Sequence, residues 1–205
     1  GRLTAEVFYS YGIERYRTKT VYNGEKVSVI DPDGRAATSI VDARGNRVEL
    51  RNHHTSNLNG GYDSITYTYD HADRLTSVTD PAGNTWSYEY DLLGRKTASV
   101  DPDTGRTEYT YYDNGLVESV TDARGESLWY EYDELGRVLY VMEDDVDGVL
   151  VKAFEYDLFG LGLPANTYQW DEDGHMYRTR VLAYDAANRP TGVRYTLPNS
   201  LGNQL

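Results

Sequence analysis

The stretch Trp86-Ser87-Tyr88-Glu89-Tyr90-Asp91-Leu92-Leu93-Gly94-Arg95 recurs along the chain in altered forms. Its large side chains alternate with Ser87 and Glu89, which is the period of a β-strand with one buried face. Gly94 then supplies a residue that tolerates positive φ, as a tight turn between antiparallel strands requires. The stretch therefore predicts a β-hairpin.

This pattern holds a 21-residue register between about Tyr62 and Met142. Two tyrosines mark each copy, and they are Tyr67 and Tyr69, Tyr88 and Tyr90, Tyr109 and Tyr111, and Tyr130 and Tyr132. The fourth residue after the second tyrosine is always Gly, Asp or Asn: Asp73, Gly94, Gly115, Gly136 and, in two looser copies, Gly160 and Asn188. Because these residue types accept a left-handed backbone, six such turns are predicted.

A second kind of turn has Asp first and Gly fourth, and it begins at Asp31, Asp42, Asp80 and Asp122. A fifth copy, at Asp101, carries one inserted residue. This composition fits a type I turn. Each repeat is thus two short strands and two turns. An arginine stands four residues after the aspartate of the Tyr-Asp turn at Arg74, Arg95, Arg137 and Arg189, which predicts a salt bridge across that turn.

One repeat cannot fold alone, because the few large side chains it buries do not offset the entropy of ordering 21 residues. Neighbouring hairpins must therefore stack and share a core. The chain contains 20 tyrosines and 3 tryptophans, so tyrosine is expected to be its main packing residue. The predicted fold is an all-β array of about seven to nine stacked antiparallel hairpins.

The array is expected to be continuous but uneven. Residues 1–61 read as degenerate repeats that end in a polar loop from His53 to Gly61, residues 62–142 as regular repeats, and residues 143–205 as irregular repeats with wider tyrosine spacing.

The charge excludes several functions. With 33 acidic and 20 basic side chains the net charge is −13, which argues against nucleic acid and anionic membranes as partners.

There is no cysteine, no apolar run long enough to insert into a membrane and no signal-peptide pattern, so any export address is expected to lie outside this segment. No nucleophile elbow or phosphate loop appears, and we expect neither an enzyme nor a cofactor.

The strings Tyr90-Asp91-Leu92-Leu93-Gly94-Arg95, Tyr132-Asp133-Glu134-Leu135-Gly136-Arg137 and Asp80-Pro81-Ala82-Gly83 resemble the YD repeat of the rearrangement-hotspot (Rhs) family. The resemblance implies a sheet that spirals into a hollow shell. Bacterial polymorphic toxins and the toxin-complex C component use such a shell to enclose a C-terminal toxin, and teneurins use a similar one in adhesion. It implies a bacterial secreted or cell-surface protein whose partners are neighbouring repeats and an enclosed polypeptide. The family's self-cleaving terminal motif has no match here.

Two further sites come from the residues themselves. Tyr112, Tyr140 and Tyr168 lie off the regular pattern, and an exposed aromatic face could stack on a sugar, although packing explains most tyrosines better. Asp144, Asp145 and Asp147, or Asp171, Glu172 and Asp173, offer hard oxygen ligands for calcium, although aspartate is also the ordinary turn residue.

The four histidines show no metal-ligand spacing and are expected in surface loops.

The first functional hypothesis is a structural wall segment. The alternatives are an extracellular carbohydrate- or protein-binding module and a calcium-dependent adhesion element. Unpaired edge strands predict edge-to-edge association between copies.

Overall fold

The structure is a computed structural model that describes residues 2, 4–145 and 147–198. Its regular elements in that part of the chain are β-strands. Within the same residues there is no helix with the length and apolarity of a membrane span. The chain divides into two compact units, residues 1–105 and 106–205. The three-part division of the sequence remains a prediction.

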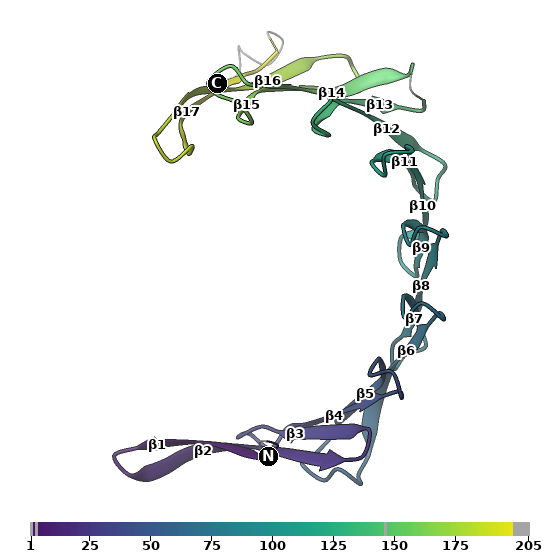
Figure 1. Ribbon diagram of the computed structural model, residues 1–205, viewed down its shortest axis with the longest axis vertical. Helices are drawn as coiled ribbons and strands as arrows, with labels where there is room; N and C mark the ends of the chain where they lie inside the picture. Colours follow the sequence, from purple (N-terminus) through teal and green to yellow (C-terminus); the bar gives the residue numbers. More distant parts are fainter. Residues whose placement is uncertain (1, 3, 146, 199–205) are drawn as a thin grey trace. The chain divides into compact units, whose positions relative to one another are not determined.

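The first unit is a series of antiparallel strands, each paired with the next along the chain (Figure 1). The strands are β1 (Ala5–Ser10), β2 (Ile13–Asn23), β3 (Lys26–Ile30), β4 (Ala36–Val41), β5 (Arg47–His53), β6 (Tyr62–Tyr69), β7 (Leu75–Thr79), β8 (Thr85–Tyr90) and β9 (Lys96–Asp101).

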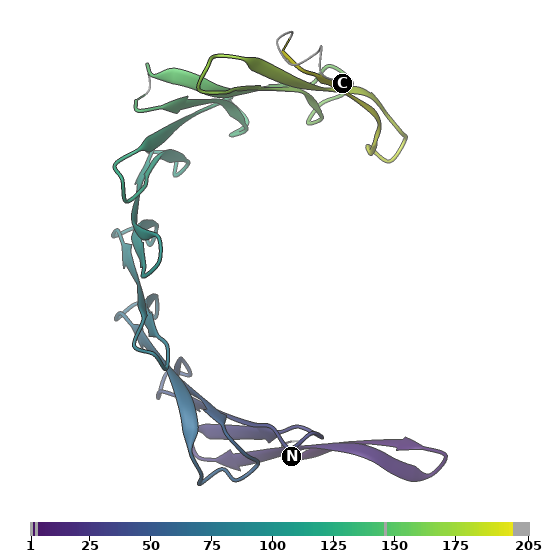
Figure 2. The same ribbon diagram turned by 180° about the vertical axis from the view of Figure 1, so that it is seen from behind.

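The second unit repeats this construction, and Figure 2 shows its hairpins from behind. Its strands are β10 (Gly105–Tyr111), β11 (Val117–Thr121), β12 (Ser127–Tyr132), β13 (Val138–Glu143), β14 (Val149–Tyr156), β15 (Pro164–Trp170), β16 (Met176–Tyr184) and β17 (Pro190–Thr196). The predicted all-β array of hairpins is confirmed.

The turns of each unit lie in two rows, one at each end of the strands, because successive antiparallel strands reverse direction. We call the row of turns after even-numbered strands the Tyr-Asp edge and the row after odd-numbered strands the Asp-Gly edge. Neither name refers to an edge strand. The turn after β4 begins at Asp42, so it belongs to the Tyr-Asp edge. The sequence had grouped Asp42 with Asp31 and Asp80. Those two turns follow β3 and β7 and lie on the Asp-Gly edge.

Positive φ occurs at five of the six predicted turn positions: Asp73 (61°), Gly94 (85°), Gly115 (88°), Gly136 (76°) and Asn188 (58°). The sixth prediction, Gly160, is wrong. The longer connection after β14 moves the left-handed residues to Asp157 (68°) and Gly162 (84°). In a regular turn the Asp133 N–H donates to Arg137 O (2.9 Å) and the Gly136 N–H to Asp133 O (3.0 Å), which is a type I turn followed by a one-residue bulge.

The two faces of the sheet differ in chemistry. Tyr67 lies opposite Val78 and Val78 opposite Trp86, so these apolar side chains share one face, which we call the tyrosine face. On the other face, which we call the polar face, Thr68 and Ser77 hydroxyls hydrogen-bond at 2.7 Å. The second unit repeats the contrast, with Tyr109 opposite Val120 on the tyrosine face and Thr110 bonded to Ser119 at 2.7 Å on the polar face.

The core is thin. No large side chain among the described residues is fully buried, and the regular tyrosines are half-buried between their neighbours. The most buried apolar residues are mainly small ones such as Ala98 and Ala165, each 1% exposed. The partly buried tyrosines pack against side chains on neighbouring strands of the same sheet, and their role as the main packing residue stays a prediction. His53 corrects another expectation: it ends β5, is 9% exposed, and its Nε2 lies 2.7 Å from Thr38 Oγ1.

Candidate functional site: the joints of the Tyr-Asp edge

Each regular Tyr-Asp turn is organised by its aspartate. In the turn after β12, Asp133 Oδ1 accepts hydrogen bonds from the backbone N–H groups of Leu135 and Arg137, both at 2.9 Å. Asp70, Asp91 and Asp185 accept the equivalent pair of N–H groups. A short carboxylate at this position satisfies the turn amides that the hairpin leaves unpaired.

The arginine four residues later closes the same turn. Arg137 Nε donates to Asp133 Oδ2 at 2.6 Å. The pairs Arg74–Asp70, Arg95–Asp91 and Arg189–Asp185 repeat this bond at 2.7–2.8 Å, which confirms the predicted salt bridges. The backbone N–H of Arg137 and then its guanidinium lower the pKa of the Asp133 carboxyl, against the opposing effect of partial burial.

The second tyrosine of a repeat bonds to the hairpin before it. Its hydroxyl donates to the carbonyl of the residue that begins the second strand of that hairpin, over 2.6–3.0 Å. The five bonds are Tyr69 to Arg47 O, Tyr90 to Leu75 O, Tyr132 to Val117 O, Tyr156 to Val138 O and Tyr184 to Pro164 O. Partial burial raises the pKa of Tyr69, Tyr132 and Tyr156, which favours the protonated, donating form.

The arginine reaches in the other direction, toward the next hairpin. Arg74 Nη1 donates to Asp91 O at 2.8 Å, and its guanidinium lies 4.9 Å from the ring centroid of Tyr90. Arg137 forms a two-pronged bond to the Asp157 carboxylate at 2.9 and 2.8 Å and lies 4.3 Å from the Tyr156 ring. Tyrosine and arginine together therefore form a joint between consecutive hairpins.

The turn after β10 lacks both charged partners. Tyr112 replaces the aspartate and Leu116 the arginine, while Gly115 keeps the turn. The Tyr112 hydroxyl donates to Tyr130 O in the next hairpin at 2.9 Å, and its ring packs edge-on against Tyr132 at 6.3 Å. The joint is thus kept in an uncharged form. Tyr112, predicted as a ligand-binding tyrosine, has its hydroxyl committed to this joint.

The other two predicted tyrosines lie on the polar face of the second unit. Tyr140 and Tyr168 both lie opposite Ala153, on either side of it. Tyr140 is 41% exposed. The Tyr168 hydroxyl donates to Glu155 Oε1 at 3.1 Å, and Arg178 lies over its ring at 5.3 Å. The structure therefore brings Tyr140 and Tyr168 into one row and leaves Tyr112 at the edge.

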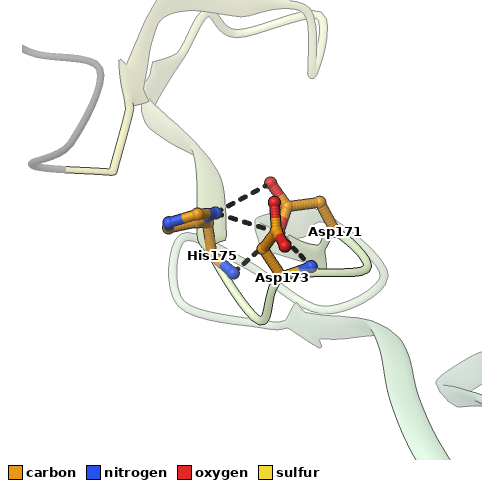
Figure 3. Close-up of side chains that lie close together, drawn as sticks. All are labelled: Asp171, Asp173 and His175. Atoms are coloured by element: carbon orange, nitrogen blue, oxygen red, sulfur yellow. Dashed lines mark hydrogen bonds and ion pairs between the residues drawn. The ribbon is translucent and has the colours of Figure 1, made fainter.

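The predicted calcium residues are arranged as turn residues. Asp145 Oδ1 accepts the Asp147 N–H at 2.9 Å. Asp171 and Asp173 of the second predicted set lie close together, and among the described residues they form a group with His175, in place of Glu172, whose ligand atoms lie within 4.8 Å of one another (Figure 3). Asp171 Oδ1 accepts the N–H groups of Asp173 and His175, and Oδ2 accepts the Tyr177 hydroxyl. These bonds are those of the other Asp-initiated turns, so calcium binding here stays a prediction.

Sequence reasoning missed the joints. It placed the arginine within its own turn but did not foresee the bonds to neighbouring hairpins. The copy that has Tyr112 in place of the aspartate also has Leu116 in place of the arginine, but this marks the pair within one turn. The bonds between hairpins depend on which strands pair and in what register, and a single copy of the repeat carries no signal for them.

Comparison with known proteins gives a consistent result. The Rhs repeat family profile matches residues 60–85, 69–107 and 111–150. No curated protein matches the chain. Among solved structures, the crystal structure of TcdB2-TccC3-TEV superposes with a TM-score of 0.74 at 17% identity, over 94% of this chain and 11% of that one. The Photorhabdus luminescens Tc holotoxin pore (TccC3-D651A mutant) gives 0.58 at 16% identity, over 94% and 14%.

A third structure, TcdB2-TccC3 without its hypervariable C-terminal region, gives a TM-score of 0.64 at 15% identity, over 94% of this chain and 14% of that one. The chain thus spans only about a tenth to a seventh of these proteins, and at this identity the likeness concerns the fold. The repeat register, the hairpin array and the matched residues agree. Residues 60–107 and 111–150 therefore carry Rhs repeats, and the hairpin array that contains them has the fold of these structures.

Proposed function

We propose that this chain is a wall segment of a shell that encloses or presents a polypeptide, such as a C-terminal toxin. The observation that carries the proposal is the joint: Tyr132 bonds back to the preceding hairpin and Arg137 forward to the next. The likeness to TcdB2-TccC3 supports it. The proposal assigns no catalytic step to the chain and places the shell in a secreted or cell-surface bacterial protein.

The joints suit a wall because they act between hairpins and not across a core. A single layer with few buried side chains gains little from packing above or below it. Hydrogen bonds from the second tyrosine of a repeat, and from arginines such as Arg74 and Arg137, hold consecutive hairpins in register along one edge. Such an array can be lengthened by adding repeats, since each repeat contacts mainly its neighbours.

Protection from protease tests the wall. In the parent protein that contains these residues, the polypeptide beyond the repeats is expected to resist a protease that digests it when it is expressed alone. The double variant Tyr132→Phe/Tyr156→Phe removes the hydroxyl bonds of two joints and should speed digestion. Tyr195→Phe alters an exposed tyrosine, 72% accessible, and should not. Equal digestion of the enclosed and free polypeptide would contradict the proposal.

A second candidate is a carbohydrate- or protein-binding module. The row of Tyr140, Ala153 and Tyr168 on the polar face favours it, because it carries an exposed aromatic side chain beside polar groups. Titration with neutral oligosaccharides, followed by intrinsic fluorescence, separates the candidates. A wall segment gives no saturable response, whereas a binding module gives one that Tyr140→Ala removes.

The chain is also proposed to associate edge to edge with other strands, either neighbouring repeats or a second copy. Light scattering over a range of concentrations checks this. We expect the apparent mass to rise with concentration, and a constant monomer mass would rule the association out.

A further inference from the structure

The hairpin β16–β17 has an unusual charge for this protein. Its strands, 9 and 7 residues long, contain Arg178, Arg180 and Arg194 and no acidic residue. The whole chain carries 33 acidic and 20 basic side chains. The only charged side chains of these two strands are therefore arginines, in a protein that is acidic as a whole.

The strand register collects the three arginines on one face. Arg180 lies directly opposite Arg194, and Arg178, two residues before Arg180, points to the same side of β16. Like charges directly opposite each other in an antiparallel pair are destabilising. This arrangement therefore works against the stability of the hairpin unless an anion joins the two guanidinium groups.

Of the three arginines, Arg178 is the one that hydrogen-bonds to a neighbouring side chain among the described residues. Asn166, which is 4% exposed, accepts hydrogen bonds from Arg178 Nε and Nη2 at 3.2 and 3.0 Å through its Oδ1. Its Nδ2 donates in turn to Glu155 Oε2 at 2.5 Å. The Glu155 carboxylate also accepts the Tyr168 hydroxyl.

Glu155 lies on β14, two strands from β16, in the row of facing residues that continues through Asn166 to Arg180. Its carboxylate is already hydrogen-bonded to Asn166 and Tyr168. Within the part of the chain that the structure describes, Arg180 and Arg194 are exposed and have no hydrogen-bond or ion-pair partner.

We propose that Arg180 and Arg194, with Arg178 beside them, form a binding site for a phosphate or sulfate group. Planar guanidinium groups match the oxygens of such an anion with paired N–H donors, which an ammonium group cannot do. The net charge of −13 does not prevent this, because at physiological ionic strength charges farther than about 8 Å are largely screened. The group arrives as a free ion or as an ester on a larger molecule.

Calorimetric titration of the 205-residue chain with inorganic phosphate and with phenyl phosphate tests the site, at constant ionic strength set by chloride. Wild type is expected to bind. Arg180→Gln and Arg194→Gln should each weaken binding about tenfold or more, since each removes charged donors. Arg180→Lys keeps the charge but loses the planar guanidinium, so its affinity for phosphate should lie between those of wild type and Arg180→Gln. The control is Arg15→Gln, which removes an exposed arginine from β2 of the first unit.

A second readout does not depend on the titration. Without phosphate, Arg194→Gln should melt at a higher temperature than wild type because it relieves the like-charge pair. Phosphate should raise the melting temperatures of wild type and of Arg15→Gln more than that of Arg194→Gln.

Tighter binding of phenyl phosphate than of inorganic phosphate identifies an ester next to an aromatic neighbour such as Tyr168, and equal binding identifies a free ion; both support the site. No binding by wild type, or an equal loss in Arg15→Gln, would overturn it.

Discussion

The Tyr132 hydroxyl donates a hydrogen bond to the backbone carbonyl of Val117 at 2.8 Å, across the boundary between two consecutive hairpins. Val117 is the first residue of β11, and the same position accepts the tyrosine bond in four other repeats. A motif that reads as local in the sequence therefore acts between repeats.

Tyr132→Phe removes this hydroxyl and leaves the ring packed against Tyr112. We expect a loss of about 0.5–1.5 kcal/mol of unfolding free energy, the usual contribution of one hydrogen bond. Chemical denaturation measures it. Tyr195→Phe is the matched control, since its side chain is 72% exposed, and it should unfold as wild type does. Equal midpoints for the two variants would show that the bond contributes nothing.

Gly136→Ala tests the left-handed turn. Gly136 has φ of 76°, and an added Cβ would meet Leu116 Cδ1 only at 3.7 Å, an ordinary contact. The cost is therefore backbone strain, about 1 kcal/mol. Gly192→Ala is the control, because no positive φ occurs at Gly192 and an added Cβ there meets Leu182 Cβ at 3.5 Å. Thermal unfolding followed by circular dichroism compares the two, and a larger loss in Gly192→Ala would refute the strain argument.

The arginine joint is tested by Arg137→Leu. Arg137 pairs with Asp133 in its own turn and with Asp157 in the next hairpin, whereas Arg189 pairs only with Asp185 in the described residues. Arg137→Leu should therefore lower the melting temperature more than Arg189→Leu does. Salt screens exposed ion pairs, so the difference between the variants should shrink in high salt. A difference that does not change with salt would mean that packing, and not charge, makes the joint.

Acid should loosen the turns. Hydrogen bonds from the backbone N–H of the arginine four residues later lower the pKa of Asp70 and Asp133, and each carboxylate also pairs with that guanidinium. A lowered folded-state pKa contributes stability that is present above the unfolded value, about 3.9, and is lost as the pH falls through the folded value. Melting temperatures measured below pH ~4 should fall, and less steeply in Asp133→Asn. Parallel curves for the two proteins would exclude this turn as a source.

Alkali should open the tyrosine joints. Burial raises the pKa of Tyr132 and Tyr156. A raised folded-state pKa contributes stability below the unfolded value, about 10, that is lost as the pH rises through the folded value. Tyrosinate absorbance should therefore appear in two stages, exposed tyrosines first and the joint tyrosines together with unfolding. A single titration at the ordinary value would contradict the joints.

Much of the fold could be predicted because its signals are local. The alternation of Trp86, Tyr88 and Tyr90 sets which side chains share a face, and glycine at positions such as Gly94 accepts the turn backbone at little cost. The exception is instructive. Gly160 is a residue type that accepts positive φ, but the longer connection after β14 also contains Gly162, and it is Gly162 that adopts this conformation. The local preference of glycine for positive φ does not distinguish two glycines in one loop.

The repeat length, the hairpins, most of the left-handed turn positions and the Asp–Arg pair within a turn can be read from the amino-acid order, because each depends on residues a few positions apart. The folded chain was needed to show which carbonyl each tyrosine hydroxyl meets, that Asp42 belongs to the Tyr-Asp edge, that His53 is buried and that Arg180 faces Arg194. Those contacts join residues that lie far apart along the chain, and their meeting depends on how neighbouring strands are paired and in what register.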